Sequence, residues 1–275
     1  MVREARLQIA LAGAGVRVPH VVAVCEDESV LGVPFYVMEY LDGAVVTDRV
    51  PPGLDSPEER ARLGLELVDA LAELHAVDLV SSGLDGFGKT TGYLERQVRR
   101  FSGLWEVNAT RELPAVAELA AWLDAHRPES AEATVVHGDY RLGNLLVSLD
   151  APARLVAIFD WELATIGDPL ADLGYLVATY SEPGSPGGPM ELSPATRAPG
   201  FPSRAELVER YAERSERPVS SLAWYEALAH WKAAVFCEAL HGRYLRGERG
   251  DAWAAALDKG VPRLLELAEE AAARS

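Results

Sequence analysis

The chain has 275 residues, 49% of them hydrophobic, which is enough to bury a substantial core in one large domain or two unequal ones. Its formal net charge of −16 argues against nucleic acid and against an anionic membrane surface as partners. The same charge suits a cationic substrate, but many enzymes are acidic throughout, and we prefer that general interpretation.

The two cysteines, Cys25 and Cys237, are far apart and form neither a disulfide framework nor a metal-binding spacing. No run of residues approaches the roughly 20 apolar residues that span a bilayer, and the first residues do not begin a signal peptide. We therefore expect a protein of the reducing cytoplasm, without a membrane partner.

The first 42 residues are predicted to contain one helix and two strands. Helical spacing of apolar residues indicates a helix over residues 4–12, and strand formers indicate strands over 20–24 and 34–40. The pair Gly13 and Gly15 follows a helix instead of a strand, so we do not interpret it as a nucleotide-binding loop.

Helical patterns follow from residue 41 onward. Ser56, Pro57 and two glutamates form a helix-start signal, and apolar spacing extends that helix to about His75, which we interpret as a packed or capping residue. Further helices are predicted over residues 92–107 and 114–126.

A hairpin is predicted next, between residues 144 and 159. Two short apolar runs, 144–149 and 154–159, are separated by a segment with turn chemistry. Asn144 opens the first strand and Asp160 follows the second, so both should lie at the open end, with Asp139 in the loop that enters it.

The last part of the chain is predicted to be helical after one irregular segment. Asp168 and Pro169 resemble a helix start, residues 182–203 are too turn-rich for a packed element, and helices are expected over 206–214, 221–245 and 251–272. The irregular segment is a candidate lid, acceptor-site loop or plain linker. A few aromatic side chains of the last helices could line an acceptor pocket, although core packing is favoured for most: Trp224, Tyr225, Trp231 and Tyr244.

The side chains at the open end of the hairpin suit phosphoryl transfer, which depends on positioning and charge neutralisation. Oxygen atoms of Asn144 and Asp160 could hold Mg²⁺ on a nucleotide. Asp139 would be free to orient an acceptor hydroxyl and take its proton, and Arg141 could reach the transferred phosphoryl group.

The run from His137 to Asn144, HGDYRLGN, followed by Asp160-Trp-Glu162, resembles the catalytic core of the aminoglycoside phosphotransferase family, distant relatives of protein kinases. The resemblance implies an α+β, protein-kinase-like fold of two lobes that uses ATP or GTP with Mg²⁺. It also implies that Asp172 braces the catalytic loop. Glu162 either assists the metal or packs beside it.

Residues 1–42 resemble the end of the nucleotide-covering lobe and the hinge, and residues 43–275 resemble the helical lobe with the acceptor site. The resemblance implies that Glu4 pairs with a phosphate-binding lysine and that Met38, Glu39 and Tyr40 contact the adenine. The glycine-rich loop and that lysine would lie before Met1. We therefore expect a small lobe that lacks its first part, through a truncated start rather than a true short form.

The run from Gly200 to Tyr211 resembles kinase-like domains found alone or fused to acyl-CoA dehydrogenases. This implies phosphorylation of a hydroxyl on a small metabolite, such as a hydroxyacyl thioester. The alternatives are a kinase-like binding protein without activity and, with less support, a metal-dependent phosphohydrolase. The acceptor and the oligomeric state stay open.

Overall fold

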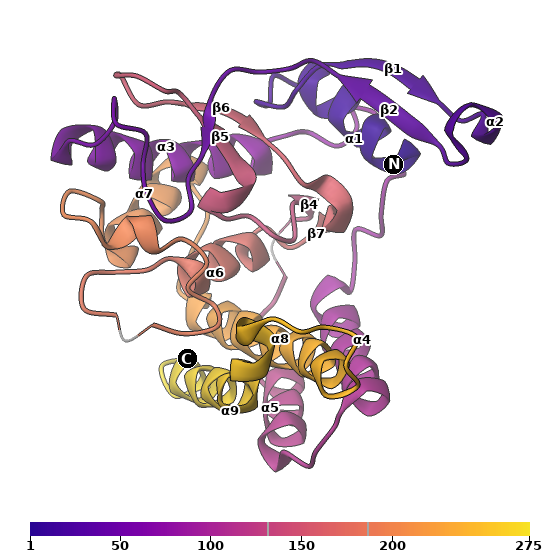
Figure 1. The fold of residues 1–275 in the computed structure, drawn as a ribbon, viewed down its shortest axis with the longest axis vertical. Helices are drawn as coiled ribbons and strands as arrows, with labels where there is room; N and C mark the ends of the chain where they lie inside the picture. The colour runs from indigo at the N-terminus through magenta and orange to yellow at the C-terminus, as the bar shows by residue number, and fades with distance from the viewer. Residues whose placement is uncertain (131, 186) are drawn as a thin grey trace.

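A computed structural model describes residues 1–130, 132–185 and 187–275. Figure 1 shows the N-terminal helix and strand pair at one end of the molecule and the C-terminal helices at the other, with a small sheet between them. Among the described residues, no helix has the length and apolar character needed to cross a membrane.

The N-terminal part consists of α1 (Val2–Gly13) and two antiparallel strands, β1 (Val21–Cys25) and β2 (Phe35–Met38). These confirm the helix and the strands predicted there. The connection holds one unpredicted turn of helix, α2 (Glu28–Leu31), because the Asp27 carboxylate accepts a hydrogen bond from the Ser29 amide and Gly32 takes a left-handed conformation with φ of 80°.

Helix α3 (Pro57–His75) begins where the sequence predicts it. The Ser56 hydroxyl accepts a hydrogen bond of 3.2 Å from the Glu59 amide, and Pro57 occupies the first turn. One face of the helix is buried in the core, through Leu63, Leu67, Leu71 and Leu74.

The predicted hairpin is confirmed in β5 (Leu145–Val147) and β6 (Leu155–Ile158), which pair antiparallel. A short strand, β3 (Ala44–Val45), extends this sheet to the order β3-β5-β6. Beside it, β4 (Thr134–Val136) pairs with β7 (Thr165–Gly167). Two 3₁₀ turns, Leu142–Asn144 and Trp161–Leu163, join these strands and carry the segments on which the site is built.

The remaining helices are α4 (Tyr93–Asn108), α5 (Pro114–Ala125), α6 (Leu170–Thr179), α7 (Arg204–Ser215), α8 (Leu222–Leu245) and α9 (Ala252–Ala272). Helix α8 packs against α4, α6 and α9. Its tryptophans belong to the core, because the Trp224 indole donates to the Leu123 carbonyl and the Trp231 indole donates to the Val116 carbonyl.

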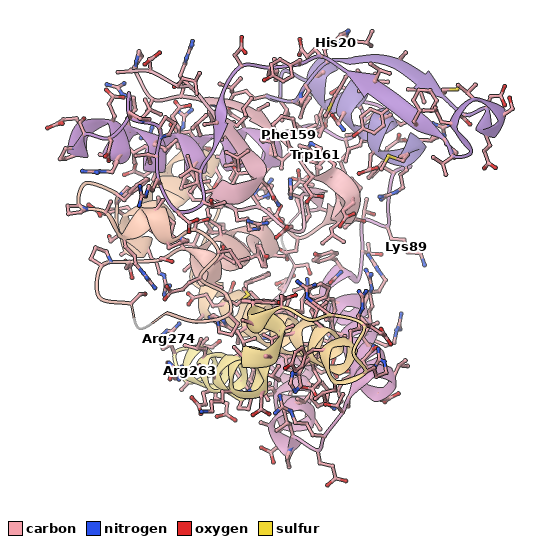
Figure 2. The ribbon with its side chains drawn as sticks, viewed as in Figure 1. His20, Lys89, Phe159, Trp161, Arg263 and Arg274 are labelled. Carbon is pink, nitrogen blue, oxygen red and sulfur yellow. The ribbon has the colours of Figure 1, made fainter. Side chains whose placement is uncertain are left out.

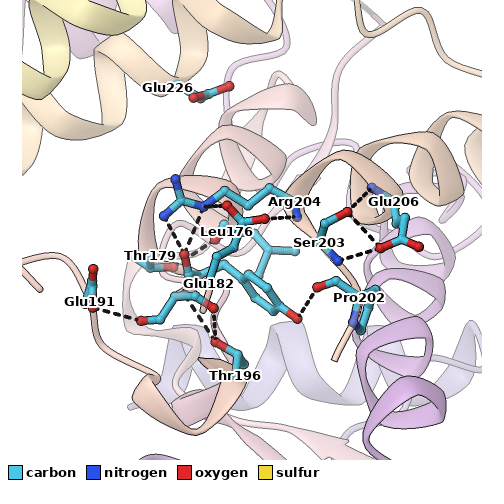
Figure 3. A network of polar contacts seen from close by, with 12 residues as sticks. Leu176, Thr179, Glu182, Glu191, Thr196, Pro202, Ser203, Arg204, Glu206 and Glu226 are labelled. Atoms are coloured by element: carbon cyan, nitrogen blue, oxygen red, sulfur yellow. Dashed lines mark hydrogen bonds and ion pairs between the residues drawn. The ribbon is translucent and has the colours of Figure 1, made fainter. Parts of the chain in front are cut away.

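The segment of residues 182–203, of which Pro186 lies outside the described residues, is more ordered than predicted. It contains a 3₁₀ turn, Pro194–Arg197, in which the Thr196 hydroxyl donates a hydrogen bond of 2.7 Å to the Ser181 carbonyl. At its end, Tyr180 donates to the Pro202 carbonyl and Arg204 donates to the Tyr180 carbonyl (Figure 3). The prediction of no packed element is wrong here, since a few side chains satisfy the backbone groups of a segment poor in apolar residues.

Candidate active site

One buried carboxylate fixes the backbone of the loop that follows β4. Asp172, in the first turn of α6, accepts hydrogen bonds from the amides of His137, at 2.6 Å, and Gly138, at 2.8 Å. Gly138 has φ of +87°, and a Cβ there would lie 2.9 Å from the Leu163 carbonyl oxygen, so the tight turn requires glycine. The structure thus confirms the bracing role predicted for Asp172.

A buried histidine stabilises this carboxylate in turn. His75 Nε2 lies 3.3 Å from Asp172, and its Nδ1 lies 2.7 Å from the Tyr211 hydroxyl. Burial lowers the pKa of His75, which keeps the ring neutral. Burial alone would raise the pKa of Asp172, but His75 and the loop amides lower it overall, so the carboxylate stays ionised. His75 is packed in the core, as predicted, and it is also hydrogen-bonded to Asp172 and Tyr211.

Asp139 lies just beyond this brace, and its carboxylate has two side-chain partners. It accepts a hydrogen bond of 2.8 Å from the Asn144 side-chain amide, which also donates to the Asp139 carbonyl at 2.9 Å. Arg141 Nε lies 3.4 Å from the other carboxylate oxygen. The short loop between Asp139 and Asn144 brings both partners back onto the carboxylate, so Asp139 is positioned before any ligand binds.

The hairpin brings Asn144 and the segment containing Asp160 together. The Phe159 amide donates a hydrogen bond of 2.9 Å to the Asn144 carbonyl, next to the Leu145–Ile158 pair. Asp160 itself has φ of 63° and ψ of 62°, a left-handed conformation that is uncommon outside glycine and often occurs at functional sites. Figure 2 labels its neighbours Phe159 and Trp161, which lie close together below the β1–β2 pair.

The donor atoms of these two residues fit Mg²⁺. The Asn144 amide nitrogen is engaged with Asp139, which leaves its oxygen available. Asp160 is exposed, and no described side chain forms a hydrogen bond or ion pair with its carboxylate. The residues that the structure describes contain no cluster of three or more His, Cys, Asp or Glu side chains suited to a metal. One amide and one carboxylate are sufficient for Mg²⁺, which keeps water and phosphate oxygens as its other ligands.

The predicted nucleotide-binding residues lie in the N-terminal part, away from the pocket beside Asp139. The Glu4 carboxylate forms an ion pair of 2.8 Å with the N-terminal ammonium. Glu39 forms two hydrogen bonds with His20: its amide donates to the His20 carbonyl, and its carboxylate accepts a hydrogen bond of 2.7 Å from the His20 amide. The side chains of Met38 and Tyr40 are 41% and 90% exposed. Their role in binding a nucleotide stays a prediction.

A largely apolar pocket of about 380 Å³ opens beside Asp139. Its walls come from α4, α6, α8 and the segment before the 3₁₀ turn at Pro194, with lining residues that include Phe101, Ala171, Met190, Leu192, Leu228 and Phe236. Of the aromatic residues suggested for such a pocket, Tyr225 lines it, and Trp253 was not anticipated. Pro189, Met190 and Leu192 in the wall support the acceptor-site interpretation of residues 182–203.

Two polar residues of the pocket were not found from the sequence. Tyr175 is hydrogen-bonded to Asp139, and burial, together with that carboxylate, raises the pKa of its hydroxyl well above the usual value. Its position three residues after Asp172, on the same face of α6, was an available signal. Lys232 of α8 also lines the pocket, and no local pattern connects it with Asp139.

A model of the phosphotransferase enzyme family matches residues 1–217. The chain belongs to this family.

Two relatives of this chain support the assignment to the family. Acyl-CoA dehydrogenase family member 10 of Mus musculus is 35% identical over 275 residues, and the match covers 97% of this chain but 25% of that protein, so this chain spans about a quarter of its length. A crystal structure from Ralstonia eutropha, assigned to the aminoglycoside phosphotransferases, is 34% identical with a TM-score of 0.88 and covers 99% of this chain and 83% of that one.

More distant structures share the fold alone. Aminoglycoside 2'-phosphotransferase-IIIa, solved as a GDP complex, is 18% identical with a TM-score of 0.60, covering 98% of this chain and 81% of that one. The comparisons confirm the predicted kinase-like fold of this chain and its resemblance to acyl-CoA dehydrogenase family members.

Proposed function

We propose that this chain transfers the γ-phosphoryl group of ATP or GTP to a hydroxyl group of a small metabolite. The observation that carries the proposal is the Asp139 carboxylate, held by Asn144 and Arg141 at the edge of an apolar pocket. Membership of the phosphotransferase family supports the reaction class. The shared fold of a phosphotransferase solved with GDP supports a nucleotide as the phosphoryl donor.

In the proposed reaction, Asp139 accepts the proton of the acceptor hydroxyl. The acceptor oxygen forms a bond to phosphorus while the bond to the nucleoside diphosphate breaks, and Arg141 offsets the charge of the transferred group. Asn144 and Asp160 would hold Mg²⁺, which neutralises charge on the nucleotide phosphates when bound. Tyr175, neutral throughout, keeps the Asp139 carboxylate oriented.

The proposal divides the chain as the resemblance does. Residues 1–42 would contact the nucleotide through Glu4, Met38, Glu39 and Tyr40, and residues 43–275 would carry the catalytic loop and the acceptor. It also places the reaction in the cytoplasm, where ATP, GTP and Mg²⁺ are available.

The test compares Asp160→Asn and Asp139→Asn with the unchanged chain, using calorimetry with ATP or GTP, with and without Mg²⁺, and a phosphotransfer assay. Asparagine tolerates the left-handed backbone at residue 160, so Asp160→Asn removes a ligand charge without adding backbone strain. We expect nucleotide binding that requires Mg²⁺ and is lost in Asp160→Asn. Asp139→Asn should bind nucleotide normally and lose about 10²-fold to 10⁴-fold in transfer rate.

The matched control is Asp85→Asn, an exposed carboxylate in the loop after α3, which should change neither property. Full transfer by Asp139→Asn would rule out its role as base. Nucleotide binding that ignores both Mg²⁺ and Asp160 would favour the binding-protein alternative.

A further inference from the structure

A second hollow, of about 530 Å³, adjoins the apolar pocket. The two hollows share lining residues, among them Phe101, Gly138 and Lys232, so they meet at the catalytic loop. The second hollow is basic: its lining includes one carboxylate, Glu162, and five cationic side chains, from Arg3, Arg96, Arg99, Arg100 and Lys232. Such a concentration of positive charge is unexpected in a chain with a net charge of −16.

Some of these cations have structural partners. Arg3 donates a hydrogen bond of 2.9 Å to the Ala164 carbonyl and stacks on the Phe87 ring. Arg96 donates to the carbonyls of Lys89 and Thr91, which fixes the loop before α4. Arg99 is highly exposed and lies 3.9 Å from Glu95. These three side chains are explained by the fold or by solvent.

Lys232 is not explained in this way, and the exposed Arg100 lies beside the same aromatic ring. The Lys232 ammonium is half-buried over the face of the Phe101 ring, 4.9 Å from its centroid, and the Arg100 guanidinium lies 6.0 Å from the same ring. Within the described residues, neither side chain forms a hydrogen bond or an ion pair with a carboxylate. The two neighbouring cations repel each other, and half-burial adds a desolvation cost for Lys232.

Burial is the main cause that lowers the pKa of Lys232 to about 8; Arg100 also acts to lower it, while Asp172 and Asp139 act to raise it. A bound anion would relieve both the repulsion and the desolvation cost. Because Lys232 lines both hollows, that anion would be continuous with a molecule that fills the apolar pocket and reaches Asp139.

We infer that the phosphoryl acceptor is an amphipathic anion. Its carboxylate or phosphate group binds Lys232 and Arg100, its apolar body fills the pocket along α8, and its hydroxyl group meets Asp139. This inference rests on the proposed function and deepens it by giving the acceptor a chemical class. The charge of the second hollow is opposite to the charge of the whole chain, so the acidic composition does not indicate the charge of the acceptor.

The experiment measures calorimetric binding of three matched probes to the full chain: a medium-chain ω-hydroxy acid, the corresponding ω-hydroxyalkyl phosphate and the neutral ω-hydroxy amide. We expect at least one anionic probe to bind about tenfold or more tightly than the amide, as a charge-assisted contact would give. The tighter of the two anions identifies the group as a carboxylate or a phosphate.

That preference should disappear in Lys232→Met, which keeps the packing on Phe101, and weaken in Arg100→Gln, which changes an exposed side chain. Lys232→Arg should restore it. Lys259→Met, an exposed lysine of α9 outside both hollows, is the matched control and should bind as the unchanged chain does.

Equal binding of the three probes, binding of none of them, or a preference that survives in both Lys232→Met and Arg100→Gln would overturn the inference. Its failure can be separated from that of the proposed function. Preference for the anionic probes without phosphotransfer would support the anion-binding site and contradict the proposed function. Nucleotide binding that requires Asp160, without a preference for the anionic probes, would support the proposed function and contradict the inference.

Discussion

Gly143 leaves room for the Arg141 guanidinium. A Cβ at residue 143 would overlap Arg141 Nη1, so a larger residue there would push the end of this side chain out of its position near Asp139. Arg141 Nε is buried and within ion-pair distance of Asp139, but it makes no hydrogen bond in the described residues. The Arg141 guanidinium is therefore a cation beside Asp139 whose Nε donor has no hydrogen-bond partner among the described residues.

Lys232 leads to a prediction about pH. Its pKa near 8 means that the ammonium is charged at neutrality and loses its proton as the pH rises through about 8. Affinity for an anionic acceptor should therefore be full below that pH and fall above it, although a bound anion will move the fall upward. The charged groups that act on Lys232 are Arg100 of α4 and the carboxylates of Asp172 and Asp139.

The measurement is the calorimetric affinity for the tighter anionic probe at a series of pH values through that range. Lys232→Met should show a flat profile over the same range, since it has nothing to titrate there. An equally steep fall in Lys232→Met would assign the titration to another group.

Helix α6 positions the site through two side chains in its first two turns. Asp172 fixes the loop backbone and Tyr175, one turn later, contacts Asp139. Asp172→Asn would present an amide group where two backbone amides need acceptors, so at least one donor would lose its partner. We expect the free energy of unfolding to fall by about 1–3 kcal/mol and the transfer rate to fall by about 10²-fold through misplacement of Asp139.

Urea unfolding and initial rates measure these two effects, and Asp85→Asn again serves as the control. If Asp172→Asn kept both stability and rate, the brace would be dispensable. Since Asp172 has a lowered pKa, its contribution to stability is present at neutral pH and is lost as the pH falls through that lowered pKa.

Elements defined by local chemistry could be predicted from the sequence, and elements defined by long-range contacts could not. The start of α3 depends on Ser56 and Pro57, and the hairpin depends on two apolar runs with a turn between them, so both were predicted. Asp139, Asn144 and Asp160 were found for the same reason, because their spacing is local.

Residues 182–203 and Lys232 show where prediction from sequence failed. The packing of Thr196 depends on its contact with Ser181, and the presence of Lys232 and Asp139 in one pocket depends on how α8 packs against α4 and α6. Neither contact leaves a periodic signal. The hydrogen bond between Asn144 and Asp139 was not predicted for a related reason, since spacing gives neighbours but not side-chain directions.

At the scale of the whole molecule, a buried charge joins the helices of the C-terminal part. Glu238 of α8 is fully buried, and it accepts hydrogen bonds from Arg111, at 3.1 Å and 3.2 Å, and from Thr110 in the α4–α5 connection. Arg111 also donates to Asp258 of α9. One arginine thus connects three parts of the helical layer.

Arg111→Met should lower the free energy of unfolding by about 3–5 kcal/mol, because it leaves the Glu238 carboxylate buried without its counter-charge. The double variant Arg111→Met with Glu238→Leu should recover part of that loss. Urea unfolding measures both. Arg263→Met, which breaks only exposed pairs on α9, should change stability by less than about 1 kcal/mol. A double variant as unstable as Arg111→Met would show that the buried charge is not the cause.

Helix α8 forms one long wall of the acceptor pocket, and a helix presents side chains at fixed steps. From Tyr225 to Phe236 the lining residues are spread over eleven steps of the helix, a rise of about 16 Å at about 1.5 Å per step. Two of the lining residues between them are alanines, Ala229 and Ala233. A larger residue at either step would shorten the space for the acceptor and leave Asp139 where it is. Single substitutions on one helix can therefore change acceptor length during evolution while the chemistry is inherited unchanged.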